Sequence, residues 1–220
     1  MQQISVNIGQ ERAIQNAKAS GKTGIYKLPV SEPVQITANG LPGDAICDVE
    51  NHGGVEQAVY IFGAPDYAWW SEHVGRELSP GTFGENLTIS ALESAQFSIG
   101  DRLHVGSVIL EVTAPRIPCV TLAVRMGDPT FVKRFRHAER PGLYCRVIQA
   151  GFVQVGEPVT WERYQGEMIT AIEMFRYFYA PDQSEATLRR HLAAPIAIRD
   201  RVEKEERLRK LVAHSPQSEL

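Results

Sequence analysis

The residue with the clearest chemical character in this chain is Cys119, which follows Pro118 at the end of an apolar, β-type run. Pro118 fixes the approach of the backbone and removes one amide donor. Arg116, three residues earlier, carries a permanent positive charge that favours the thiolate over the thiol. This pattern predicts a cysteine that acts as a sulfur ligand or nucleophile. The alternative is a buried cysteine that packs as a small hydrophobe.

Two short segments combine glycine with polar groups that suit a ligand. Lys22 and Thr23 lie between two glycines, which favours contact with an anion, although the spacing of a phosphate-binding P-loop is absent. A flexible turn that leads into a strand is the alternative there. In the second segment, Asn86 follows Gly84 and Glu85, so backbone and amide groups could face a ligand.

A third segment runs from Asp48 to the sequence His52-Gly53-Gly54. Two adjacent glycines let the backbone approach a ligand closely and expose amides that bind anions. Asp48 could orient the imidazole of His52 or bind a polar group itself. The alternative is a tight glycine turn in which His52 satisfies a local carbonyl.

Composition limits the classes of protein that fit. The chain has 220 residues, a net charge of -3 and a pI near 6.1, which argues against a general nucleic-acid binder. It has three cysteines, no secretory signal at its start and no apolar segment of the length that a membrane helix needs. We therefore expect a cytoplasmic protein with free thiols and no membrane partner.

The elements that must position these groups are mainly strands. Residues 1–163 contain many short β-branched runs with turn residues between them, which predicts a β-barrel domain. Residues 99–112 predict a hairpin that turns at Gly106-Ser107. Two peripheral helices are expected, over residues 66–75 and from Cys119 or Thr121 to Phe135.

Residues 164–220 predict a small α-helical module of three helices. The first begins near Met168 and ends before Pro181, and Asp182 with Glu185 has the form of a capping box for the second. The third, residues 198–212, alternates acidic and basic side chains and is expected to be a solvated amphipathic helix.

Taken in order, six segments resemble the MOSC domain, and most closely its YiiM-type members. The matching segments are residues 22–27, 48–54, 83–88, 99–101, 115–119 and 140–144. The helical tail is similar to the three-helix module of YiiM-type proteins, so the resemblance reaches nearly the whole chain. One departure is the absence of a lysine in the segment after the two glycines, where this chain has Gln57.

This resemblance implies a β-barrel-like fold and a molybdenum cofactor, in which the dithiolene of a pterin holds the metal. It implies that Cys119 is the protein's thiolate ligand to molybdenum. It also implies reduction of N-hydroxylated compounds, such as hydroxylamino purine analogues, to amines, which is a detoxification. The residues expected to bind the cofactor are Lys22, Thr23, Gly53, Gly54, Asn86, Arg116 and Cys119.

The chemistry implied has further requirements. Cleavage of an N–O bond needs two electrons and protons, and His52 and Asp48 are the candidate proton donors. The sequence has no dinucleotide fingerprint and no cysteine cluster for iron–sulfur, so we expect a separate electron-donor protein, which the helical tail could dock. The alternative function is a sulfur carrier or cofactor-binding module that uses Cys119 without reductase turnover. The oligomeric state is left open.

Overall fold

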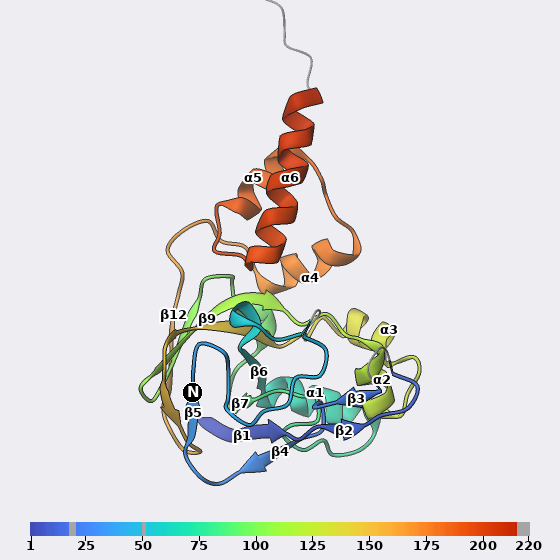
Figure 1. The fold of residues 1–220 in the computed structure, drawn as a ribbon, viewed down its shortest axis with the longest axis vertical. Coiled ribbons are helices and arrows are strands. Elements are labelled where there is room, and N and C mark those ends of the chain that lie inside the picture. Colours follow the sequence, from blue (N-terminus) through green and yellow to red (C-terminus); the bar gives the residue numbers. More distant parts are fainter. Residues whose placement is uncertain (18–20, 50–51, 215–220) are drawn as a thin grey trace, which may run out of the picture.

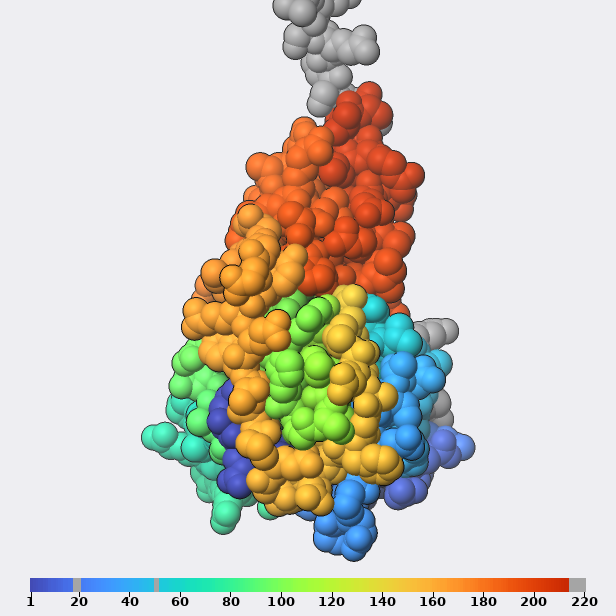
Figure 2. All heavy atoms as spheres, turned by 90° about the vertical axis from the view of Figure 1, so that its left-hand side faces the viewer, coloured from blue at the N-terminus to red at the C-terminus, as the bar shows by residue number. Residues whose placement is uncertain are grey.

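The computed structural model describes residues 1–17, 21–49 and 52–214. A body of strands with helices on its flank forms one part of the molecule, and the C-terminal helices stand on one end of it (Figure 1). Figure 2 shows the same helices, in orange and red, projecting from the rest of the surface.

Eight strands form one mixed sheet in the order β12-β8-β9-β10-β6-β7-β1-β4, in which β6 and β7 are parallel. Their bounds are β1 (Gln3–Gly9), β4 (Lys27–Val30), β6 (Val59–Gly63), β7 (Leu87–Ile89), β8 (Arg102–Val105), β9 (Val108–Pro115), β10 (Leu143–Gln149) and β12 (Val159–Glu162). The sheet closes because the Gln3 amide donates to the Glu157 carbonyl and the Val159 amide to the Met1 carbonyl, each at 2.9 Å. The predicted mainly-β class is therefore confirmed.

Smaller elements complete the body. Two short ribbons pair β2 (Arg12–Ala13) with β3 (Lys22–Thr23), and β5 (Val34–Ile36) with β11 (Gly151–Val153). Two 3-10 turns are η1 (Val55–Gln57) and η2 (Ser94–Gln96).

The hairpin predicted for residues 99–112 is present as β8 and β9. Val105 pairs with Val108, so Gly106 and Ser107 form the turn. Gly106 has a φ of 57°, a left-handed value that glycine adopts without steric cost. This short connection places β9 next to β10, and the end of β9 leads directly into Arg116 and Cys119.

Three helices cover an aromatic cluster on the flank: α1 (Ala64–Val74), α2 (Val120–Met126) and α3 (Phe131–Ala138). The expectation of one helix up to Phe135 was wrong, because Gly127 ends α2 with a φ of 68° and α3 starts anew after Thr130. The buried aromatic side chains of this cluster are Tyr60, Phe62, Tyr67, Trp70, Phe83, Phe131, Phe135, Tyr144 and Phe175.

The tail contains α4 (Ala171–Tyr179), α5 (Glu185–Leu192) and α6 (Ile198–His214). The start near Met168 was wrong, because Thr170 caps α4 by accepting a hydrogen bond from the Glu173 amide at 3.0 Å. The capping box was also wrong: the residue that caps α5 is Ser184, whose hydroxyl accepts from the Thr187 amide at 3.3 Å.

The tail packs tightly on the barrel. Ile169, Ala171 and Met174 belong to the same apolar cluster as the barrel interior, and Phe175 enters the aromatic cluster. An Nη of Arg146 on β10 donates to the Pro195 carbonyl at 2.7 Å. A domain boundary at residue 163 stays a prediction. Within the described ranges, no helix has the length and apolar character needed to cross a membrane.

Candidate active site

Cys119 stands at the junction between the end of β9 and the start of α2. Its carbonyl accepts a hydrogen bond from the Leu122 amide, at 3.0 Å, in the first turn of the helix. Pro118 keeps the backbone of Ile117 out of the helical region, and Cys119 itself is extended, with a φ of -122° and a ψ of 169°. The thiol is partly exposed, unlike that of Cys145, which is fully buried in the barrel core.

The surroundings of Cys119 favour its ionised form. Burial of the sulfur opposes ionisation, but a hydrogen bond from His52 and the positive charge of Arg116 outweigh it. Together with the Leu122 amide, they lower the pKa of the Cys119 thiol to about 6. The sulfur is therefore mostly thiolate at neutral pH, as the sequence context predicted.

His52 connects this sulfur to a tyrosine. The hydroxyl of Tyr144 on β10 lies 3.3 Å from Nδ1 of His52, and His52 also hydrogen-bonds to Cys119. The His52 amide donates to the Asp48 carbonyl at 2.9 Å, so these two predicted site residues are in direct contact. Tyr144, His52 and Cys119 thus form a hydrogen-bonded row, of which the sequence had indicated the last two.

Arg116 is a buried cation with a free donor. It is 5% exposed, donates from Nη1 to the Phe83 carbonyl at 2.8 Å, and lies 4.9 Å from the ring centroid of Tyr60. Its Nε is buried and has no hydrogen-bond partner in the part of the chain that the structure describes. A buried guanidinium with an unused donor is typical of a site that an anionic or carbonyl oxygen completes.

A narrow pocket of about 100 Å³ runs from Cys119 past Arg116 towards β3. Of the residues predicted to act in the site, those that line this pocket are Lys22, Thr23, Asp48, His52, Gly53, Asn86, Arg116 and Cys119. Gly54 is not among its lining residues. Gly53 and Gly54 have φ values of 84° and 76°, so this turn depends on glycine.

Lys22 and Thr23, the two predicted cofactor-binding residues on β3, lie in different environments. The Lys22 side chain is largely exposed and pairs with Glu11 at 2.6 Å. The Thr23 hydroxyl accepts from the Ile25 amide at 3.1 Å, so it supports the local turn. Their roles toward a cofactor stay predictions.

Sequence reasoning missed a buried ion pair in the same pocket. Lys27, 6% exposed, forms a salt bridge with Asp44, whose carboxylate also accepts from the Asn86 amide nitrogen at 2.8 Å. Burial lowers the pKa of Lys27, and the charge of Asp44 opposes that shift. This pocket therefore contains a lysine on β4, although the position at Gln57 lacks one.

The amide side chain of Asn86 is engaged within the protein. Its oxygen accepts from the Tyr60 amide at 3.1 Å, and its nitrogen donates to Asp44. The neighbouring Glu85 is fully buried away from the pocket and accepts from the Gly81 amide, the Tyr67 hydroxyl and the Thr88 hydroxyl. Glu85 and Asn86 therefore hold the loop that carries the backbone past Arg116.

A second, larger cavity of about 620 Å³ opens on the other side of Cys119, between the barrel and the C-terminal helices. Both cavities share Asp48, His52, Gln57, Cys119, Thr121 and Tyr144. The tail contributes α4, the turn after it and α6 to this cleft. Cys119 thus lies where a narrow polar pocket meets an open cleft.

The donor set bears on the kind of metal that the site could hold. Among the described residues, no group of three or more His, Cys, Asp and Glu side chains is arranged to hold a metal ion. A metal at Cys119 would need most of its ligands from another molecule, as in a cofactor that carries its own metal. The soft thiolate and the unpartnered Arg116 Nε and Gln57 Oε1 fit such a group.

Fold and site together define a β-barrel protein with an ionised cysteine at the mouth of a pocket lined by cations and glycines. The profile of the MOSC domain matches residues 48–160. The protein named uncharacterized protein YflK of Bacillus subtilis is 34% identical over 153 residues, which cover 70% of this chain and 69% of that protein. The chain belongs to the MOSC domain family.

Two further comparisons agree with this assignment. A protein of Gibberella moniliformis named reductase is 32% identical over 142 residues, which cover 63% of this chain and 25% of that protein. The crystal structure of YiiM from Geobacillus stearothermophilus has a TM-score of 0.77 at 25% identity and covers 94% of this chain and 98% of its own. The predicted resemblance is therefore confirmed, and the family associates the chain with the molybdenum cofactor.

Proposed function

We propose that this protein is a molybdenum-cofactor-dependent reductase of N-hydroxylated compounds, in which the Cys119 thiolate is a ligand of the metal. The observation that carries this proposal is the position of a cysteine with a pKa of about 6 between a narrow pocket and an open cleft. A relative named reductase supports the reaction type.

The narrow pocket is the proposed place of the pterin. Arg116 and Lys27 supply positive charge, the Gly53 backbone lets the group approach closely, and Gln57 offers an unpaired oxygen. When bound, the cofactor supplies the redox centre that delivers two electrons to an N–O bond. In the overall reaction, an N-hydroxylated nitrogen gains two electrons and two protons, the N–O bond breaks, and an amine and water are formed.

The chain's own groups serve the proton part of this reaction. His52 lies between Tyr144 and Cys119 on the wall of the cleft, where a substrate would bind, and is the first candidate proton donor. Asp48 borders both cavities and is the second candidate donor. Electrons are expected from a separate donor protein, whose docking surface stays a prediction.

The second candidate is a sulfur carrier, because a reactive thiolate at the mouth of a cleft also suits persulfide chemistry. The two functions differ in turnover. Cofactor-loaded protein with an artificial electron donor is expected to convert benzamidoxime to benzamidine, and Cys119→Ser is expected to lose that activity. Cys47→Ser is the matched control, since Cys47 lines the same pocket and burial raises the pKa of its thiol. A loaded wild type that transfers sulfur but reduces no N-hydroxylated compound would establish the carrier instead.

A further inference from the structure

The C-terminal helices bring an ammonium group to the cleft. Lys204 of α6 lines the cleft and is 4% exposed. Its Nζ lies 4.3 Å from the ring centroid of Tyr177 on α4, and it makes no ion pair or hydrogen bond with the residues that the structure describes. The carboxylates of Asp200 and Glu203 on the same helix attract this ammonium, but neither accepts a hydrogen bond from it, so its N–H donors are left for a ligand.

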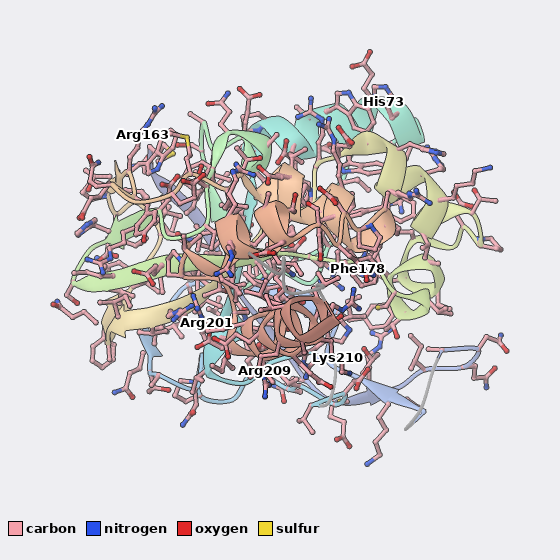
Figure 3. All side chains as sticks on the ribbon, turned by 90° about the horizontal axis from the view of Figure 1, so that it is seen from above. His73, Arg163, Phe178, Arg201, Arg209 and Lys210 are labelled. Atoms are coloured by element: carbon pink, nitrogen blue, oxygen red, sulfur yellow. The ribbon has the colours of Figure 1, made fainter. Side chains whose placement is uncertain are left out.

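A second unused polar group lies beside it. Tyr177 lines the same cleft, and its hydroxyl is buried and has no hydrogen-bond partner among the described residues. Two unpartnered polar side chains that face one cleft indicate a ligand group with acceptor oxygens. Phe178, on the adjacent position of α4, lines the cleft with 59% of its surface exposed, which suits the planar part of such a ligand (Figure 3).

The charges around Lys204 limit the charge of that ligand. The charged side chains of α6 that line the cleft are Arg199, Asp200, Glu203, Lys204 and Arg207. With all of them ionised, three cations face two carboxylates, so this wall has one positive charge in excess. The imidazole of His191 on α5 contacts the Tyr177 ring, with 4.8 Å between the ring centroids. A singly charged anion neutralises the excess charge of this wall. The second charge of a dianion would be repelled by Asp200 and Glu203 with no cation left to offset it.

We propose that Lys204 and Tyr177 bind an anionic group of the substrate, and that this protein therefore prefers planar N-hydroxylated substrates that carry a carboxylate. The carboxylate accepts hydrogen bonds from the Lys204 ammonium and the Tyr177 hydroxyl, and the N-hydroxyl end reaches toward Cys119. This inference rests on the proposed function for its reaction, but the binding site itself does not depend on turnover. Burial lowers the pKa of Lys204, and the charges of Asp200 and Glu203 oppose that shift.

The test uses two probes of equal shape, 4-carboxybenzamidoxime and its neutral analogue 4-carbamoylbenzamidoxime. In cofactor-loaded wild type, the carboxylate is expected to have a KM about tenfold lower or more, because hydrogen bonds to a charged group are stronger than those to a neutral amide. Lys204→Gln is expected to remove this preference, and Tyr177→Phe to reduce it. Lys210→Gln, on the same helix but with 69% of its side chain exposed, is expected to keep it (Figure 3).

A second measurement separates this inference from the proposed function. Calorimetric titration of cofactor-free protein with the same two probes is expected to show tighter binding of the carboxylate to wild type, and equal binding of both to Lys204→Gln. Equal KM values and equal affinities in wild type would overturn the inference while leaving reductase activity intact. If cofactor-free protein preferred the carboxylate probe but cofactor-loaded protein did not, the inference would also be overturned. A group of the cofactor would then be the ligand that Lys204 binds. If neither probe is reduced, the calorimetric affinities alone decide whether Lys204 binds the carboxylate.

Discussion

The ionisation of Cys119 can be tested by removing the hydrogen bond from His52. In the folded protein the Cys119 pKa is about 6, so about nine-tenths of the thiol is ionised at pH 7. Of the groups that favour the thiolate, the His52 hydrogen bond contributes most. A hydrogen bond to a charged group contributes about 1.5–3 kcal/mol, which corresponds to about one to two units of pKa. His52→Ala is therefore expected to raise the pKa of Cys119 to about 7–8.

The assay is the rate of alkylation by iodoacetamide as a function of pH, in cofactor-free protein that also carries Cys47→Ser. Cys145 remains silent because it is fully buried, which raises the pKa of its thiol. At pH 7, His52→Ala is expected to react more slowly than its parent, and at pH 9 the two rates are expected to converge. If the alkylation rate of His52→Ala still reached half its maximum near pH 6, the role assigned to His52 would be refuted. A parent midpoint near pH 9 would refute the thiolate itself.

Three further outcomes follow from the site. Because the pKa of Cys119 is lowered to about 6 in the folded state, the unfolded chain binds more protons than the folded chain above that pH. The melting temperature of cofactor-free wild type should therefore rise from pH 6 to 8 relative to that of Cys119→Ser. Parallel plots of melting temperature against pH for the two proteins would contradict this. Lys27→Met leaves Asp44 buried without its partner and should lower the free energy of unfolding by about 3–5 kcal/mol in urea titrations, whereas Lys22→Gln at the exposed pair should leave it near wild type. Glu85→Ala removes the acceptor of three hydrogen bonds and should destabilise by at least about 2 kcal/mol; a melting temperature equal to wild type would contradict the role given to that carboxylate.

Local sequence was sufficient to find the residues whose chemistry is set by close neighbours. Pro118 and Arg116 lie within three residues of Cys119, and they determine much of its backbone position and charge environment. The β-branched runs likewise predicted the barrel, because alternation and turn residues act over short distances. The three helix errors, at Gly127, Thr170 and Ser184, concern helix ends, where a single left-handed glycine or cap decides the outcome.

What sequence could not show were the contacts between distant segments. Lys27 pairs with Asp44 across 17 positions, and nothing in either local pattern indicates that both are buried. Lys204 lies in a charged run that predicts a solvated helix, yet packing against α4 leaves it 4% exposed. Tyr144 lies in the last segment that resembles the MOSC domain, but its relation to His52 could not be predicted, because it arises from the pairing of β10 with β6 and β9.

The most direct test of the proposed function is the molybdenum content of protein expressed in a host that makes the cofactor, with wild type, Cys119→Ser and Cys47→Ser measured side by side. We predict close to one molybdenum atom per chain in wild type and in Cys47→Ser, and a large loss in Cys119→Ser with its fold retained by circular dichroism. Equal molybdenum in all three proteins would contradict the assignment of Cys119 as the ligand. No molybdenum in any of them, with the cofactor supply of the host verified, would contradict the proposed function.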